Sequence, residues 1–385
     1  MTVAEKLSAG VSRRGLLTGG LAGGFLLAFH LPMRAGNEPV QPPDVTDGKF
    51  APNAFIRIDR AGTTTLVMPQ VEMGQGVYTS ISMILAEELD ADFSRVALEH
   101  APPSDKLYGN PMFGIQATGN SNSIRAWWKP LRTAGASSRA MLVQAAARQW
   151  QVDPASCTTA NSEVMHKASG RRLSYGALAL AASSEVPPKD VPLKEPGDFV
   201  LIGKPLKRLD TPDKVNGNAV YGIDAMLPGM KFATLKTCPV FGGKVAKVDD
   251  SAASKIPGVR KIVVLDDLVA VVGDHTWAAK KGLDALVIDW DEGPNAGVSS
   301  IDIWRDLRAA TEKDGAVAKS VGDIKKGLAS GDRLEAAYEL PFLAHATMEP
   351  INATVHVTPD ACEIWTGTQV MTRVQSEAAK AAGLP

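Results

Sequence analysis

The stretch Glu-Met-Gly-Gln-Gly-Val-Tyr-Thr, at residues 72–79, decides the fold. It follows a strand-like run at 63–68 and opens directly onto apolar residues at helical spacing. Glycines at a helix entrance let backbone N–H groups approach a phosphate or another anion closely, because no Cβ stands in the way. The loop lacks the lysine of a P-loop and the third glycine of a dinucleotide fingerprint. Such a turn alone is more often a plain helix entry than a cofactor cradle, so the flanking sequence has to distinguish the two.

A helix and then a strand are expected directly after this loop. Apolar residues between Ile81 and Leu89 recur at helical spacing, while Glu87, Glu88 and Asp90 point away from that stripe. Residues 94–100 then alternate in polarity, as a strand does.

A second polar loop comes before a second helix. Residues 116–123 read Gln-Ala-Thr-Gly-Asn-Ser-Asn-Ser, a dense run of small hydroxyl and amide side chains, and residues 127–150 continue with helical spacing. The alternative is a simple capped loop, with Ser123 as the N-cap of that helix. Repetition of strand, loop and helix predicts that residues 51–182 form an α+β layer with two polar loops at its rim.

The rest of the chain is expected to form a linker and two further blocks. Six prolines mark residues 184–213 as the linker. The block 214–291 is expected to hold strands at 231–236, 260–265, 268–272 and 287–290 and a helix at 277–286. The block 301–385 is expected to begin with a helix, to hold strands at 334–339, 353–357 and 363–366, and to end with a helix at 370–382.

Composition indicates an ordinary globular protein. With 385 residues, two or three domains are expected. A formal net charge of -1 shows no basic excess, so no nucleic-acid partner is expected. The three cysteines, Cys157, Cys238 and Cys362, lie far apart and cannot form an iron–sulfur or zinc site by themselves. If the protein handles electrons, another chain has to carry the relay.

The N-terminus has the features of an export signal. Arg13 and Arg14 come before a mild, glycine-rich apolar stretch at 18–31, which is typical of a Tat signal. The stretch falls short of the roughly 20 apolar residues that a spanning helix needs. We therefore expect residues 1–35 to be a Tat-type signal and the protein to be periplasmic, or membrane-anchored if the signal is not cleaved near Ala35.

Several motifs in one order resemble a single family. The chain resembles the large molybdopterin-binding subunit of the xanthine dehydrogenase and aldehyde oxidase superfamily, of the isoquinoline 1-oxidoreductase beta-subunit type. Besides 72–79, the motifs are Ala86-Glu87-Glu88-Leu89, Thr118-Gly119-Asn120-Ser121, Leu131-Arg132-Thr133-Ala134-Gly135-Ala136, the run 208–215, Tyr221-Gly222-Ile223-Asp224, the run 344–350 and Trp365-Thr366-Gly367-Thr368-Gln369.

The resemblance implies an α+β, multidomain architecture of the molybdenum-hydroxylase large subunit. Residues 51–182 would be a molybdopterin-binding segment that is permuted to the N-terminus, since xanthine dehydrogenases carry the corresponding loop late in the chain. Residues 214–291 would be an α/β hammerhead domain, and residues 301–385 the start of an incomplete main molybdopterin-binding domain. Surface termini make such a permutation physically reasonable.

Two departures from the family accompany the resemblance. The family continues past a point like Pro385 into a Gly-Gly-Gly-Phe-Gly loop and a Gly-Glu motif that carries the general base, and neither is present here. The chain is therefore expected to be truncated, and its catalytic residue is unknown. Leu343 stands where xanthine dehydrogenase-like chains have a glutamine.

The resemblance also implies a cofactor, partners and site residues. The cofactor would be molybdenum held by a pterin of the cytosine dinucleotide type, with no protein ligand to the metal. The partners would be a small [2Fe–2S] subunit, a cytochrome acceptor, and an aromatic heterocycle or aldehyde as substrate, oxidised with water-derived oxygen. The cofactor-binding residues would be Gly74, Gln75, Gly76, Thr79, Thr118, Gly119, Asn120, Ser121 and Ser123.

Other functions and other roles for single residues stay open at this point. The chain could be a non-catalytic remnant of such a subunit, or an exported binding protein without cofactor. His345 and Glu349 have the i, i+4 spacing of a metal pair, but two ligands without a third favour a structural turn. Trp127 and Trp128 are expected to serve packing rather than substrate stacking.

Overall fold

The computed structural model describes residues 25–27, 55–188 and 190–384, in two compact units. The first unit comprises Met1–Ala225 and Met348–Pro385, and the second comprises Met226–Thr347. The predicted Tat-type signal at 1–35 lies outside the described residues, apart from 25–27. No helix in the described ranges is long and apolar enough to cross a membrane.

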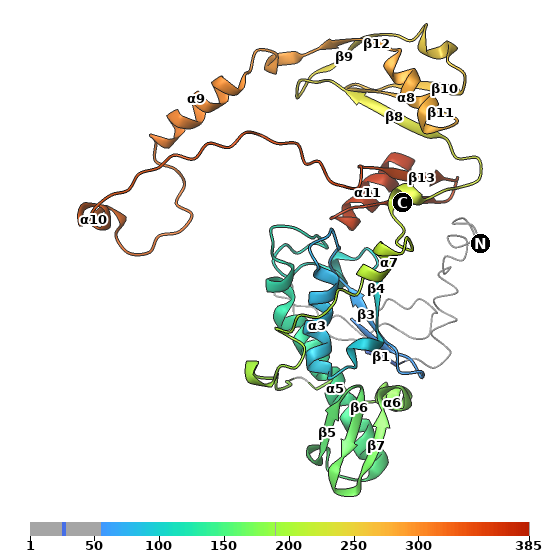
Figure 1. Cartoon of the computed structure of the whole chain (residues 1–385), viewed down its shortest axis with the longest axis vertical. Coiled ribbons are helices and arrows are strands. Elements are labelled where there is room, and N and C mark those ends of the chain that lie inside the picture. The colour runs from blue at the N-terminus through green and yellow to red at the C-terminus, as the bar shows by residue number, and fades with distance from the viewer. Residues whose placement is uncertain (1–24, 28–54, 189, 385) are drawn as a thin grey trace. The chain divides into compact units, whose positions relative to one another are not determined.

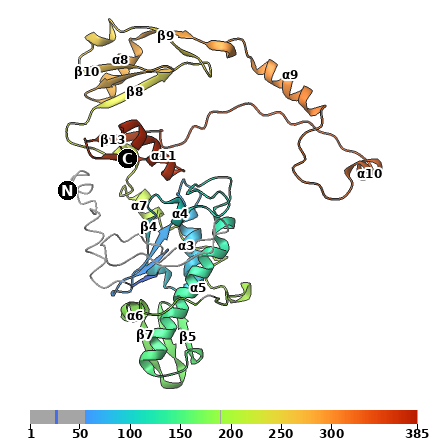
Figure 2. The same ribbon diagram turned by 180° about the vertical axis from the view of Figure 1, so that it is seen from behind.

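The first unit is built on a four-stranded sheet covered by two helices (Figures 1 and 2). Its strands, in spatial order, are β1 (Phe25–Leu27), β2 (Ile56–Ile58), β3 (Thr64–Met68) and β4 (Val96–His100). β3 and β4 are parallel, with Thr64 opposite Val96 and Met68 opposite His100, and α3 (Val77–Leu89) makes the crossover between them. The loop 72–79 is therefore the connection from β3 into α3, as the sequence predicts.

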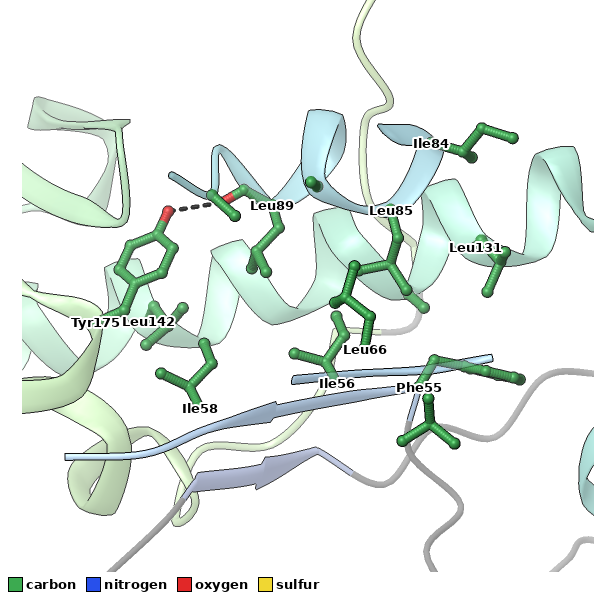
Figure 3. Close-up of a cluster of buried hydrophobic side chains, with 14 of the residues drawn as sticks. Phe55, Ile56, Ile58, Leu66, Ile84, Leu85, Leu89, Leu131, Leu142 and Tyr175 are labelled. Atoms are coloured by element: carbon green, nitrogen blue, oxygen red, sulfur yellow. Dashed lines mark hydrogen bonds between the residues drawn. The ribbon is translucent and has the colours of Figure 1, made fainter. Parts of the chain in front are cut away.

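The core of this unit lies between the sheet and the helix pair α3 and α5 (Ser123–Trp150), as Figure 3 shows. Leu85 and Leu89 of α3 and Leu142 of α5 are fully buried in one cluster with the sheet residues Ile58 and Leu66. Tyr175 closes the end of the core, where its hydroxyl donates to the Leu89 carbonyl at 2.7 Å. The buried leucines of α3 and α5 are the apolar stripes that the helical spacing predicts.

The helices α3 and α5 pack closely against each other at Gly135. A Cβ placed there would lie 2.5 Å from the Leu85 carbonyl oxygen and 2.9 Å from the Glu88 Cβ, so no larger side chain fits without backbone movement. We expect Gly135→Ala to lower the free energy of unfolding by about 1–2 kcal/mol, although alanine favours the helix, because overpacking outweighs propensity. Thr133→Ala, on the same helix, is the control and should change it by less than about 0.5 kcal/mol in urea unfolding. An unchanged or raised stability of the glycine variant would contradict this packing.

A small sheet within residues 51–182 was not predicted. β5 (Cys157–Ala160), β6 (Glu163–His166) and β7 (Arg171–Ser174) form an antiparallel sheet, followed by α6 (Tyr175–Ala182). These strands have four residues each and are partly exposed, so their hydrophobic alternation is weak. The available signal was the pair Asn161-Ser162, whose φ values of 47° and 61° suit a two-residue hairpin turn.

Glu87 and Glu88 point away from the apolar stripe of α3, but they do not face solvent. Both residues are fully buried, because residues 194–202, from the predicted linker, cover the second face of α3. The Glu87 carboxylate accepts from the Lys194 ammonium at 2.7 Å and from three backbone N–H groups between 200 and 202. The Glu88 carboxylate binds Arg132 at 2.7 Å. Residues 194–202 are thus packed structure rather than a free spacer.

The second unit consists of antiparallel strands packed with α8 (Thr276–Asp284), followed by two further α-helices. It contains a three-stranded sheet in the order β10 (Val259–Val264), β11 (Leu268–Gly273) and β8 (Phe232–Thr237), and a pair of β12 (Val287–Asp291) and β9 (Lys244–Asp249). α9 (Ser300–Thr311) and α10 (Ile324–Ala329) follow. The strands and helix predicted within 231–290 are confirmed, and β9 is an addition.

The predicted strand at 334–339 is wrong. The chain has no regular structure there, and Leu334 and Tyr338 are 97% and 88% exposed. Their alternation resembles a strand, but a strand also needs a hydrogen-bonded neighbour, which the described part of the chain does not provide.

The last elements belong to the first unit. β13 (Ala353–Val357) and β14 (Cys362–Thr366) form a hairpin, and α11 (Met371–Ala382) follows. All three were predicted, but as part of one block from 301 to 385, whereas the compact units divide between Thr347 and Met348. The Thr118 N–H donates to the Gln369 carbonyl at 2.9 Å, and the Gln369 side-chain amide donates to the Thr118 carbonyl at 2.7 Å. These bonds tie this segment to the second polar loop.

Candidate functional site

The loop 72–79 adopts a backbone conformation that requires its glycines. Gly74 and Gly76 have φ values of 101° and 82°, in the region that glycine adopts without strain. A Cβ at either residue would meet no atom within 4 Å, so the Cα faces of both glycines are open. The backbone of the loop is therefore in the left-handed region at both glycines, and their Cα atoms are accessible.

The anion at this helix entrance is the chain's own Glu72. Its carboxylate accepts from the N–H groups of Gly74 at 2.7 Å, Gly76 at 2.9 Å and Tyr78 at 3.1 Å. These are backbone donors of the kind that was expected to face a phosphate. Arg208 lies 3.2 Å from the same carboxylate and also donates to the Gly74 carbonyl at 3.0 Å. The loop is thus an anion-binding turn whose donors Glu72 occupies in this structure.

Two of the predicted binding side chains serve the loop itself. The Gln75 amide donates to the Val71 carbonyl at 2.8 Å, and its oxygen accepts from the Met73 N–H. The Thr79 hydroxyl is buried and accepts from the Leu209 N–H at 3.0 Å. Gln75 is exposed but spends its polar atoms on the loop, and Thr79 is buried. The run 208–215 packs on this loop rather than in the second unit.

The two polar loops lie together, and Gln70 joins them. Its fully buried amide donates to the Ala117 carbonyl at 3.3 Å and accepts from the Ser123 hydroxyl at 2.8 Å. The Thr118 hydroxyl accepts from the Val71 N–H at 2.9 Å and adds a second bond between the loops. Gln70 was not among the predicted site residues, although it stands directly before the loop; a lone glutamine carries no sequence signal for a contact 47 residues away.

Asn120 and Ser121 form the exposed tip of the second loop. Their φ values are 52° and 48°, which places two successive non-glycine residues in the left-handed region. Each such residue costs about 1–2 kcal/mol, a strain that proteins keep mainly at functional sites. Gly119, beside them, has open space where a Cβ would stand.

The base of the second loop contains buried donors without acceptors. Gln116 Nε2 and Asn122 Nδ2 are buried and have no hydrogen-bond partner among the described residues. Unpaired buried amides are rare and costly, so they indicate an acceptor that is not part of the described chain. The alternative that Ser123 caps the helix is wrong, because α5 begins at Ser123 and its N-cap is Asn122, without a side-chain capping bond.

A cavity of about 250 Å³ lies next to the first loop, within the first unit. It brings together residues of β4, the loop start, the 220–222 turn and the C-terminal segment, namely Val71, His100, Val220, Tyr221, Gly222, Glu349, Thr366, Gly367, Thr368 and Met371. Three of the motifs that carry the family resemblance therefore converge on one cavity. Gly222 permits this packing, because a Cβ there would lie 2.8 Å from the Asn352 side-chain oxygen.

The remaining candidates have structural roles. Trp127 is buried and meets Phe55 edge to face, with ring centroids 5.4 Å apart, so its predicted packing role is confirmed. Trp128 lies under the Arg132 guanidinium at 5.1 Å. His345 and Glu349 fall in different units. In the described ranges, no group of three or more potential ligands is arranged to hold a metal ion.

Two family models match the chain. Both are described as a molybdopterin cofactor-binding domain, one over residues 33–226 and the other over residues 309–385. The first covers the two polar loops and the cavity residues up to Gly222, and the second covers the cavity residues from Glu349 to Met371.

Three curated relatives are similar over most of this chain. The beta subunit of isoquinoline 1-oxidoreductase from Brevundimonas diminuta is 33% identical over 97% of this chain and 54% of its own length. Membrane-bound aldehyde dehydrogenase (pyrroloquinoline-quinone) of Gluconacetobacter polyoxogenes is 32% identical over 98% and 50%. One of the subunits of nicotinate dehydrogenase from Pseudomonas putida is 28% identical over 82% and 27%. The chain spans about half the length of the first two relatives.

Among solved structures, quinoline 2-oxidoreductase from Pseudomonas putida 86 matches 24% of this chain and 16% of its own, with 16% identity and a TM-score of 0.21. This match is too small to support an argument about fold or function.

Proposed function

The chain belongs to the molybdopterin cofactor-binding domain family, as a molybdenum-binding subunit of the xanthine dehydrogenase type, and from this premise we propose that its two polar loops hold the molybdenum cofactor of a hydroxylase. The observation that carries the proposal is the Gln70 clamp, the pair of hydrogen bonds by which Gln70 joins the two loops at Ala117 and Ser123. It places the open faces of Gly74 and Gly76 and the strained tip of the second loop in one joined assembly.

The residues present suit an anionic, flat cofactor. The open Cα faces of Gly74, Gly76 and Gly119 allow a planar group to approach the backbone, while Glu72 keeps the N–H groups of Gly74 and Gly76. The buried amides of Gln116 and Asn122 need acceptors, which phosphate and pterin oxygens provide. Asn120 and Ser121 are exposed and offer further side-chain donors.

The chain's own part in the chemistry is binding and orientation. When bound, the cofactor supplies the redox centre at which an N-heterocycle or an aldehyde is oxidised with oxygen from water. Gly74, Gly76, Gly119, Asn120 and Ser121 would contact it directly, and Gln75, Thr79, Thr118 and Ser123 would hold the loops around it. Precise orientation of a cofactor is the main contribution that a protein of this kind makes.

The assembly and location of the protein are further parts of the proposal. The cytosine dinucleotide form of the cofactor, a small [2Fe–2S] partner and a cytochrome acceptor follow from the family resemblance, and the scattered cysteines leave the electron relay to another chain. Arg13 and Arg14 support Tat-dependent export to the periplasm. Residues 214–291 would be the α/β hammerhead domain, because their antiparallel sheet carries a single helix.

The test is the molybdenum and pterin content of the full chain, purified after co-expression with the molybdopterin pathway and a candidate iron–sulfur partner. We expect close to one molybdenum and one pterin per chain, by mass spectrometry of the metal and by fluorescence of the oxidised pterin. A folded, soluble chain that carries neither would refute the proposal.

A further inference from the structure

Burial divides the second polar loop into two anchored ends and an exposed tip. Gln116, Thr118 and Asn122 are buried, whereas Asn120 and Ser121 between them are exposed and have left-handed backbones. A strained tip of this kind keeps its conformation only where the surrounding structure holds the chain on both sides. The residues that hold the ends therefore decide whether the tip stays in place.

The near end of the loop is held by the segment that follows β14. The Thr118 N–H donates to the Gln369 carbonyl at 2.9 Å, and the Gln369 side-chain amide donates to the Thr118 carbonyl at 2.7 Å. Both backbone polar groups of Thr118 are thus bound by one residue that lies 251 positions later in the chain. The Thr118 hydroxyl also accepts from the Val71 N–H, so this contact extends to the first loop.

A second anchor from the same segment acts on Gln116. The carboxylate of Asp105, the first residue of α4 (Asp105–Tyr108), accepts from the Gln116 N–H at 2.7 Å and from the Thr372 hydroxyl at 2.8 Å. The Gln116 side-chain oxygen accepts from the Ser104 N–H at 2.7 Å. Backbone and side chain of Gln116 are therefore both fixed. These bonds also set the orientation of its Nε2, which has no acceptor among the described residues.

The exposure of Gln369 separates its role from that of a core residue. Gln369 is exposed and is not part of the buried cluster, so loss of its side-chain amide should leave the core intact. What the amide adds is preorganisation of the loop. A loop that is already held in its binding conformation loses less conformational entropy when a ligand binds.

We propose that Gln369 is a positioning residue which, together with the contact between Asp105 and Thr372, holds the second polar loop ready for the cofactor. The inference rests on the proposed function and adds to it that the segment after β14 controls this loop. Gln369 acts through Thr118 rather than on the cofactor itself. Loss of its amide should therefore loosen the loop first and the bound cofactor as a consequence.

Gln369→Met tests the proposal in the full chain, because methionine keeps the length of the side chain and removes its donor. In the cofactor-free chain, we expect peptides covering 116–123 to exchange hydrogen roughly 2- to 10-fold faster, as the loss of one neutral hydrogen bond implies. In chain purified with cofactor, the release of pterin, measured by its fluorescence after oxidation, should be faster by a similar factor at an unchanged Tm. Gln375→Met, at an exposed glutamine of α11, is the matched control and should behave like the wild type.

The outcomes separate this inference from the proposed function. Unchanged exchange in Gln369→Met overturns the inference, and so does faster exchange with pterin release equal to that of the wild type. Both results leave the proposed function standing, because the wild type still carries cofactor. A wild type that purifies without molybdenum and pterin refutes the function, and the inference falls with it.

Thr372→Val is the second variant, since valine keeps the shape of the side chain and removes its bond to Asp105. It should also speed the exchange of residues 116–118 and the release of pterin. Circular dichroism checks the fold of each variant, and Thr372→Val replaces Gln369→Met if that variant unfolds. Exchange and release equal to those of the wild type would then overturn the inference.

Discussion

Glu87→Gln is expected to lower the free energy of unfolding by about 3 kcal/mol. Breaking a buried ion pair typically costs about 3–5 kcal/mol, because the remaining charge is left without its partner in a poorly solvated place. The lower end applies here, since Lys194 keeps Asp90 at 2.7 Å after Glu87 loses its charge. Urea unfolding of the full chain, followed by near-ultraviolet circular dichroism, measures the loss.

Glu163→Gln is the matched control for this experiment. Glu163 is 41% exposed and pairs with Arg172 at 3.6 Å on the surface of the small sheet. Surface ion pairs contribute about 0–1 kcal/mol, so the same substitution should have little effect there. A loss below about 1 kcal/mol in Glu87→Gln, similar to the control, would mean that the Glu87 network does not hold residues 194–202 on α3.

The stabilisation by Glu87 also depends on pH with a definite sign. Burial alone would raise the pKa of Glu87, but the Lys194 ammonium and the three backbone N–H groups outweigh it and hold the pKa below its usual value. A lowered pKa in the folded state stabilises the protein above the unfolded value of about 4.3, and this stability is lost as the pH falls through the folded pKa. The difference between wild type and Glu87→Gln should therefore be constant near neutrality and shrink below about pH 4. A difference that grows on acidification would contradict the assignment.

Glu72→Ala is expected to release the glycine loop. The carboxylate is only 5% exposed and holds the amides of Gly74, Gly76 and Tyr78. Each hydrogen bond to a charged group contributes about 1.5–3 kcal/mol, so local opening of these amides should become roughly 10- to 100-fold more frequent. Hydrogen exchange of peptides that cover 72–79 measures the change directly.

The control for the loop variant is Glu99→Ala on neighbouring β4. Glu99 pairs with Arg57 at the sheet and is 31% exposed, but the loop does not depend on it. Its exchange pattern over 72–79 should match that of the wild type. If Glu72→Ala leaves the exchange of these amides unchanged, the loop conformation is set by its glycines alone, and the carboxylate has no part in it.

Local pattern was enough to predict the framework of this chain. The apolar spacing of α3 and α5, the alternation of β4, and the motifs on either side of the glycine loop all result from interactions within a few residues. The two loops were also correctly singled out as the polar rim of the α+β layer, because their composition is unlike that of the flanking elements.

The parts that could not be predicted depend on long-range partners. The burial of Glu87 was not predicted, because its partners lie 107 to 115 residues later in the chain. The contacts of Gln70 with Ala117 and of Arg208 with Gly74 also join residues that are far apart in the sequence. The strand expected at 334–339 is wrong because alternation is a local pattern, whereas a strand also needs a hydrogen-bonded neighbour from elsewhere in the chain. The burial of the Thr79 hydroxyl under the Leu209 N–H is likewise a tertiary property, since the two residues are 130 apart in the sequence.

The most direct test of the central claim, that the two clamped loops hold the molybdenum cofactor, is a hydrogen-exchange comparison of the loaded and the cofactor-free protein. We predict slower exchange on loading in peptides covering 72–79 and 116–123, with little change in 226–347. Cofactor binding that leaves both loops unprotected, or protects only residues 226–347, would contradict the account.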